Sequence, residues 1–168
     1  ALVRDEKGQK MSKSKGNVID PLELIEKYSA DALRFTLLSM ASPGRDVKLS
    51  EDRVKGYRNF LNKIWNANNF LTQNKCDFGD VKKPENINLT INKWILSELV
   101  KVKNDTENSL KNYRFDEAAK NIYQFVWHSF CDWYLELSKT VLNSENEEDI
   151  KELRQTSAYV FKEILIIL

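Results

Sequence analysis

Residues 115–140 read FDEAAKNIYQFVWHSFCDWYLELSKT, a stretch without glycine or proline. Its apolar side chains recur every three or four residues, which places them on one face of an α-helix. The spacing predicts a long helix from Asp116 to about Thr140 with one buried side. The apolar stripe consists of Phe115, Ala119, Ile122, Val126, Phe130, Trp133 and Leu137.

Helical spacing continues on both sides of this stretch. Ser50 can cap a helix that reaches about Asn74, and Thr90 can begin another that ends near Lys111. A last helix follows the polar turn at 143–147 and runs to the chain end. Because helices with one apolar face can bury it only against one another, we expect residues 50–168 to form an antiparallel helical bundle.

The first 49 residues are expected to form a small α/β segment in front of the bundle. Asp20 followed by Pro21 is a strong helix start, and Ser29 can cap a second helix over 30–41. Residues 45–49 alternate in polarity and can form a short strand that pairs near Leu2 and Val3. The predicted fold class is therefore mainly α, with a domain boundary between residues 49 and 50.

Composition excludes several kinds of function. Lys and Arg number 26 against 25 for Asp and Glu, so any attraction for a polyanion must be local. Cys76, Cys131 and His128 give at most three soft ligands, too few for a structural zinc site, and no metal ligand is predicted.

With no long apolar run and no signal-like start, a cytoplasmic protein without a membrane partner is expected. The apolar end at 164–168 favours a piece of a longer protein, truncated within its helical domain.

Residues 10–17 read KMSKSKGN and are the first candidate for chemistry. Three lysines alternate with two hydroxyl side chains, a composition that suits a polyphosphate because lysines are compact charges and hydroxyls are small donors. The spacing is not that of a Walker loop. By charge alone, a lysine-rich stretch of this kind favours the alternative interpretation, a solvated basic loop or an import-like patch.

The helix expected after Ser50 is the second candidate. The stretch from Arg53 to Lys75, which comprises most of this helix and the residue after it, has five cations and no carboxylate. Asn59, Asn62, Asn66 and Asn69 recur at helical spacing. Amides can read base edges while cations hold a phosphate backbone, and Phe60 or Phe70 could stack on a base. In the alternative interpretation, the amides only face solvent and the rings belong to the core.

The segment Lys10-Met11-Ser12-Lys13-Ser14 resembles the KMSKS signature of class I aminoacyl-tRNA synthetases. Five further blocks resemble the family in the same order, and the block at 42–49 is most similar to the valine-specific members. Isoleucine- or leucine-specific members remain an alternative, as does a helical protein-interaction module without RNA binding. The five blocks are GNVIDP (16–21), ADALRF (30–35), SPGRDVKL (42–49), YRNF with NKIWNA (57–60 and 62–67) and FCDWYLE (130–136).

The resemblance implies an ATP-binding loop, with Lys13 as the catalytic residue and Lys10 assisting it. It implies that the bundle binds the tRNA anticodon and that the full-length enzyme is a monomer using ATP, Mg²⁺, valine and the tRNA for valine. The family's other motif needs two histidines, whereas this chain has one, so we expect the chain alone to be inactive and to bind no cofactor. The candidate residues are Lys10, Met11, Ser12, Lys13 and Ser14 for ATP, and Lys55, Arg58, Asn59, Phe60, Asn62, Lys63 and Asn66 for tRNA.

Overall fold

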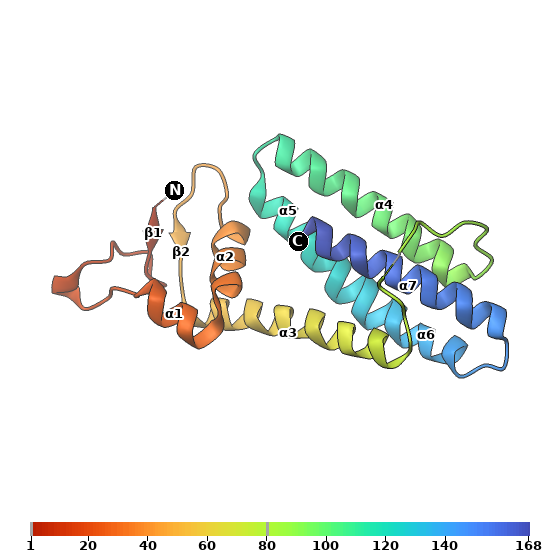
Figure 1. Ribbon diagram of the computed structural model, residues 1–168. Coiled ribbons are helices and arrows are strands. Elements are labelled where there is room, and N and C mark those ends of the chain that lie inside the picture. The colour runs from red at the N-terminus through yellow and green to blue at the C-terminus, as the bar shows by residue number, and fades with distance from the viewer. Residues whose placement is uncertain (1, 80) are drawn as a thin grey trace. The chain divides into compact units, whose positions relative to one another are not determined.

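The computed structural model describes residues 2–79 and 81–168, and it confirms a mainly helical chain with one small sheet (Figure 1). The chain divides into two compact units. Unit 1 consists of the residues up to Asn62 together with Thr106–Lys120, and unit 2 consists of Lys63–Asp105 and Asn121–Leu168. The domain boundary expected between residues 49 and 50 stays a prediction.

Unit 1 begins with a parallel pair of two-residue strands. Strand β1 (Val3–Arg4) pairs with β2 (Val47–Lys48), and the Val47 amide donates to the Leu2 carbonyl over 2.8 Å. The strand predicted over 45–49 is thus confirmed, including its pairing near the start of the chain. The segment between the strands contains a 3-10 turn, η1 (Lys13–Lys15), and the helices α1 (Pro21–Tyr28) and α2 (Ala30–Ser39).

Both helix starts predicted in this segment are confirmed by their caps. The Asp20 side chain accepts from the Leu22 amide, and the Ser29 hydroxyl accepts from the Ala32 amide. Each cap satisfies a backbone N–H that has no partner inside the helix, which is why the starts can be read locally. The core of unit 1 is formed by Leu24, Ala32, Leu33, Leu49 and Val54.

Three helices run from one unit into the other, and unit 2 is completed by further helical segments. The first three are α3 (Glu51–Gln73), α4 (Thr90–Lys111) and α5 (Phe115–Gln124). Unit 2 adds η2 (Phe125–Tyr134), α6 (Leu135–Leu142) and α7 (Glu147–Ile167), and α6 and α7 lie side by side (Figure 1). Asn146 caps α7 by accepting from the amides of Glu148 and Asp149.

The helix predicted over 116–140 is continuous from Phe115 to Leu142, but its middle part η2 is a π-helix. The Leu135 amide there donates to the Phe130 carbonyl, five residues back. This wider turn shifts the buried face relative to a regular α-helix. The predicted stripe therefore holds up to Phe130 and is wrong for Trp133 and Leu137, which are 62% and 43% exposed. Tyr134, Leu135 and Ser138 are buried in their place.

Neither a membrane span nor a disulfide is found in the described part of the chain, residues 2–79 and 81–168. None of its helices combines the length and the apolar character needed to cross a bilayer. Cys76 and Cys131 are free and buried. Burial raises the pKa of each thiol to about 11, so both stay protonated and unreactive at neutral pH.

Candidate functional site

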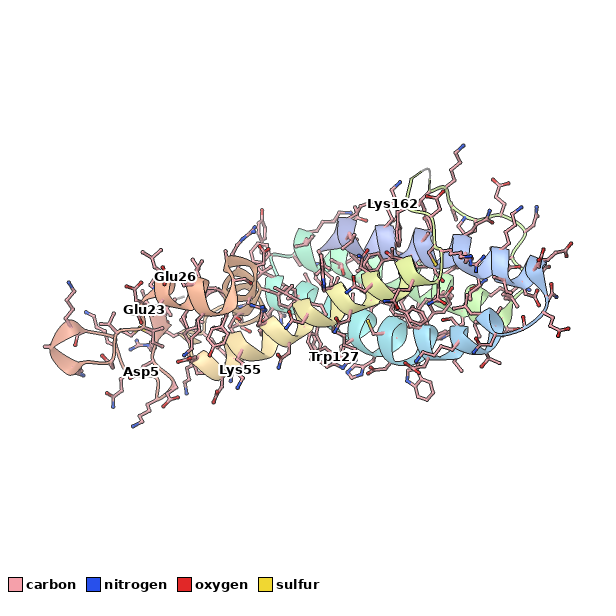
Figure 2. The ribbon with its side chains drawn as sticks, turned by 60° about the horizontal axis from the view of Figure 1, so that its bottom comes forward. Asp5, Glu23, Glu26, Lys55, Trp127 and Lys162 are labelled. Atoms are coloured by element: carbon pink, nitrogen blue, oxygen red, sulfur yellow. The ribbon has the colours of Figure 1, made fainter. Side chains whose placement is uncertain are left out.

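The KMSKS residues lie on a loop of unit 1 whose two ends are tied together. The Asp5 carboxylate accepts from the Gln9 amide over 2.7 Å and from the Asn17 side-chain amide over 2.8 Å (Asp5 is labelled in Figure 2). Asn17 also donates to the Lys10 carbonyl over 3.2 Å and accepts from the Ser12 amide over 2.9 Å. The bond from Asn17 is the main cause of a lowered pKa of Asp5, which keeps this carboxylate ionised.

The tip of this loop is the 3-10 turn η1, which ends at Gly16. Gly16 has a φ of 64°, in the left-handed region that glycine adopts without steric cost, and its amide donates to the Lys13 carbonyl. The hydroxyls of Ser12 and Ser14 lie 3.3 Å apart. The loop thus brings two small polar side chains together next to the lysines.

The lysines of the loop are exposed and carry uncompensated charge. Among the described residues, none forms an ion pair with Lys10, Lys13 or Lys15. Met11 between them is half-buried and packs against the core of unit 1. An anchored methionine with free amino groups on both sides gives a donor set that fits a polyphosphate.

Helix α3 presents its amide row to solvent. Asn59, Asn62, Asn66 and Asn69 are all exposed, the first two in unit 1 and the last two in unit 2. The opposite side of the helix is buried at Val54, Ile64 and Leu71. The structure therefore leaves the side-chain amides of Asn59, Asn66 and Asn69 exposed, while Asn62 is exposed but accepts a hydrogen bond from Arg58.

The cations of α3 differ from one another in their surroundings. Lys55 is exposed (labelled in Figure 2), whereas half-buried Arg58 donates to Asn62 Oδ1 over 3.2 Å and to the Tyr28 carbonyl over 3.4 Å. Lys63 forms an ion pair with Asp132. Its Nζ also lies 4.3 Å from the centre of the Trp127 ring.

The positive field of α3 is therefore weaker than its sequence indicates. Asp132 comes from η2, 69 residues away in the chain, so a window around Lys63 could not reveal it. The hydrogen bond from Lys63 is the main cause of a lowered pKa of Asp132, which holds the carboxylate in its charged form beside the amine.

The prediction that Phe60 stacks on a base is corrected, because its side chain is buried. Its side chain is fully buried, and its ring centre lies 5.3 Å from that of half-buried Phe35. The ring has no face open to a base. Trp65, by contrast, is 67% exposed and was missed. Its position, three residues after Asn62 and four before Asn69, was the signal that could have revealed it.

Sequence reasoning also missed a basic hollow in unit 1, with a volume of about 630 Å³. Arg4 in this hollow is paired with Asp46, and Arg45, Lys48 and Arg53 add three further cations. The four cations come from β1, from the end of the loop before β2, from β2 and from the start of α3. Only the folded chain brings these segments together.

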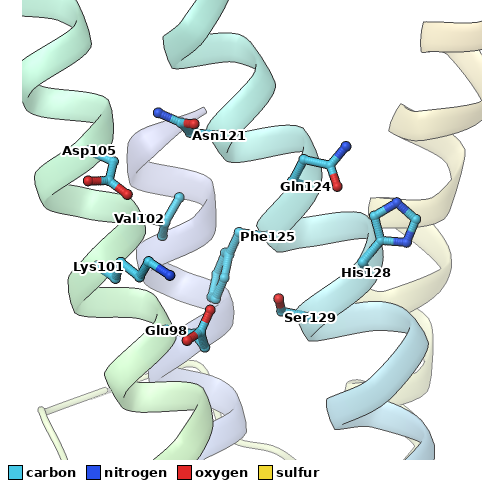
Figure 3. Close-up of a pocket in the computed structure, with 9 residues that line it drawn as sticks. All are labelled: Glu98, Lys101, Val102, Asp105, Asn121, Gln124, Phe125, His128 and Ser129. Carbon is cyan, nitrogen blue, oxygen red and sulfur yellow. The ribbon is translucent and has the colours of Figure 1, made fainter.

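A smaller hollow of about 280 Å³ lies in unit 2 (Figure 3). His128 on its rim bonds to Asp132 through Nδ1 over 3.2 Å. The lining contains one lysine and two carboxylates, so it favours neither an anionic nor a cationic ligand. In residues 2–79 and 81–168, no group of three potential metal ligands is found. The lining is Glu98, Lys101, Val102 and Asp105 from α4, with Asn121, Gln124, Phe125, His128 and Ser129 from α5 and η2.

Two family models match different segments of the chain. Residues 1–50 match the model of the class I tRNA synthetases (I, L, M and V), and residues 92–168 match the anticodon-binding domain of tRNA ligase. The chain is therefore similar to tRNA synthetases of class I in both of these segments. The predicted resemblance, which rested on the KMSKS loop and five further blocks, is confirmed.

Within this class, the chain is similar over its whole length to valine–tRNA ligases. It is 74% identical to that of Pelagibacter ubique strain HTCC1062, 55% to that of Rhizobium meliloti strain 1021 and 52% to that of Bartonella quintana strain Toulouse. Each match covers 100% of the chain and 19%, 18% and 18% of the respective relative. The chain therefore spans about a fifth of the length of these relatives.

A solved structure shares the fold. The chain resembles the LeuRS of Agrobacterium radiobacter K84 in the ternary complex LeuRS-tRNA-LeuAMS, with a TM-score of 0.66 at 19% identity. The match covers 99% of the chain and 21% of that protein. This likeness supports the arrangement of the helices and the small sheet.

Proposed function

We propose that the chain is the part of a valine–tRNA ligase that supplies the ATP-contacting loop and helices that bind the tRNA anticodon. The full-length protein would be a cytoplasmic monomer that activates valine with ATP and Mg²⁺ and transfers it to the tRNA for valine. The observation that carries this proposal is the loop tied by Asp5 and Asn17, which presents unpaired lysines. The boundary between the segment that carries this loop and the anticodon-binding domain would fall between residues 49 and 50.

In this proposal, Lys13 and Lys10 stabilise the negative charge that develops on the leaving pyrophosphate. Fixed cationic donors aimed at developing charge are typically worth about 2.7–4 kcal/mol. Ser12 and Ser14 donate hydrogen bonds to phosphate oxygens, and Met11 holds the loop against the core. Because the chain has a single histidine, the rest of the adenylate site must come from elsewhere, and the chain alone would neither activate valine nor hold ATP and Mg²⁺.

The anticodon-binding surface would lie on α3. Lys55 and Arg58 are suited to phosphates, and Asn59, Asn62 and Asn66 are suited to base edges. Lys63 is assigned a weaker role because Asp132 neutralises it. The basic hollow around Arg45, Lys48 and Arg53 offers a second place for phosphates.

A substitution in the loop tests the ATP assignment in the full-length protein. Lys13→Ala should lower ATP–pyrophosphate exchange by about 100- to 1000-fold while tRNA affinity stays unchanged. Lys7→Ala is the matched control because Lys7 is an exposed lysine just outside the loop. Equal losses of exchange and tRNA affinity in Lys13→Ala would contradict the assignment.

Salt dependence tests the RNA assignment against a protein-interaction module. Affinity for the tRNA should fall steeply as salt rises, because phosphate contacts release counterions. Lys55→Ala should weaken binding of all tRNAs alike, whereas Asn66→Ala should mainly reduce discrimination between anticodons. If tRNA affinity changes neither with salt nor with Lys55→Ala, the proposed α3 surface is wrong, and a chain that does not bind tRNA would favour the protein-interaction module.

A further inference from the structure

Trp65 is an exception on α3, every residue of which the structure describes. It is the only large apolar side chain of this helix that is more than a third exposed, at 67%, whereas Val54, Phe60 and Leu71 are buried. An indole ring is the largest apolar side chain, and leaving it in water forgoes the free energy of its burial. Its exposure therefore needs an explanation from its surroundings.

The neighbours of Trp65 on the helix surface are amides. Asn66 follows it directly and Asn69 lies four residues on, about one turn away, and both are exposed parts of unit 2 like Trp65 itself. Each amide offers two donors and one acceptor. A flat ring beside such groups matches an unpaired base, whose face can stack while its edge forms hydrogen bonds.

The charge around Trp65 also favours a base over a phosphate. Lys63, two residues earlier, is held by Asp132 and lies against the Trp127 ring. Binding at this point would therefore depend on stacking more than on ion pairing. A protein partner would be expected to cover a contiguous apolar patch, but the exposed residues next to Trp65 on α3 are asparagines.

We propose that Trp65 stacks on an unpaired base of an RNA loop, with Asn66 and Asn69 bonding to the edge of that base. This proposal rests on the proposed function, because it names the kind of nucleotide that the α3 surface binds. It replaces buried Phe60 with an accessible ring. Trp133, 62% exposed on η2 of the same unit, provides a matched control ring.

The test measures binding of the 168-residue chain to a fluorescein-labelled RNA hairpin with the anticodon arm sequence of the tRNA for valine. Trp65→Ala should weaken hairpin binding by about 5- to 150-fold, the range expected for loss of one stacked base. Trp65→Phe should retain most of the affinity, and Trp133→Ala should retain all of it. A blunt duplex with the same stem should bind equally well to the wild type and to Trp65→Ala.

Indole fluorescence provides a second measurement. A stacked base quenches an indole, so hairpin-induced quenching should be lost in Trp65→Phe and kept in Trp133→Phe. A circular dichroism melt of Trp65→Ala that matches the wild type ensures that lost binding is not lost folding.

The remaining outcomes separate this proposal from the proposed function. Hairpin binding that falls with Lys55→Ala but not with Trp65→Ala would overturn the role of Trp65 and leave RNA binding by α3 intact. Equal losses with Trp65→Ala and Trp133→Ala would overturn it in favour of unspecific apolar contact. A Trp65→Ala change confined to self-association, measured by sedimentation velocity, would instead assign the ring to a protein interface. A wild-type chain that does not bind the hairpin would overturn both proposals.

Discussion

The side-chain amide of Asn17 donates to Asp5 Oδ2 over 2.8 Å, and this contact joins the two ends of the loop that carries the signature lysines. Asp5 lies before the loop and is only 9% exposed, so its side chain is held by the surrounding protein. A loop fixed at both ends confines rearrangement to the residues between them, which include Lys10, Lys13 and Lys15. Such a loop can close over a ligand without reordering the unit that carries it.

Replacing Asn17 should loosen the loop without unfolding unit 1. Asn17→Ala removes the bonds to Asp5, Lys10 and Ser12, at a local cost of about 1–3 kcal/mol. Trypsin cleavage after the loop lysines should become about 5- to 150-fold faster, as expected when local opening becomes easier by that amount. Asn104→Ala, at an exposed asparagine of α4, should leave the cleavage rate unchanged. The same rate in both variants would argue against the tie.

The sequence predicts best those features that depend on a few neighbouring residues. The caps at Asp20 and Ser29 are confirmed because a cap joins a side chain to an amide two or three residues away. The stripe of the long helix fails after Phe130 because helical periodicity assumes a regular turn, and η2 departs from it. The same assumption gave no reason to separate Trp133 from the core.

In the candidate sites, too, local patterns could be predicted and contacts between distant residues could not. The lysine loop and the amide row were visible because each is a local pattern. The neutralising partner of Lys63 was not, because Asp132 is 69 residues away. The basic hollow depends on Arg4 and Arg53 meeting in the folded unit, and no sequence window contains both with their neighbours.

The loss of folding stability at acidic pH should depend on Asp116. Its carboxylate accepts from Arg114 Nε over 3.1 Å and from Ser42 Oγ over 2.7 Å, and these bonds lower its pKa from 3.8 to about 2. Because the pKa is lowered in the folded state, the contribution to stability is complete above about pH 4 and is lost as the pH falls towards 2. Asp116→Asn should therefore cost about 1–2 kcal/mol at pH 7 and much less near pH 2.

Urea unfolding at pH 7 and at pH 2.5, the two pH values of the test, would measure this difference. Asp31→Asn is the control, because Asp31 pairs with Arg34 through side chains that are 71% and 82% exposed, and such pairs contribute little. Wild-type and Asp116→Asn chains that lose the same free energy of unfolding between these pH values would rule out the assignment.

The buried tyrosine of η2 should be essential for the stability of unit 2. Tyr134 is fully buried, its hydroxyl donates to Asn92 Oδ1 over 2.8 Å and lies 3.1 Å from Ser157 Oγ, and burial raises its pKa. Tyr134→Phe keeps the ring but leaves the two partners unsatisfied, which should cost about 1–3 kcal/mol in the free energy of unfolding. Tyr113→Phe, at a side chain that is 75% exposed, should cost less than about 0.5 kcal/mol. Equal effects in denaturant titrations would show that the hydroxyl of Tyr134 contributes nothing.

Two aromatic residues of α3, five positions apart, should respond in opposite ways to truncation. Phe60→Ala removes a fully buried ring that packs on Phe35, and the resulting cavity should cost about 3–5 kcal/mol of stability. Trp65→Ala removes an exposed ring and should change the free energy of unfolding by less than about 0.5 kcal/mol. If the ring of Trp65 serves RNA and that of Phe60 serves the core, Trp65→Ala should lose hairpin affinity at wild-type stability. Phe60→Ala should lose stability, and in the fraction that remains folded hairpin affinity should be retained. A large loss of stability in Trp65→Ala would mean that the ring packs in solution, and its exposed face could then not be reserved for a base.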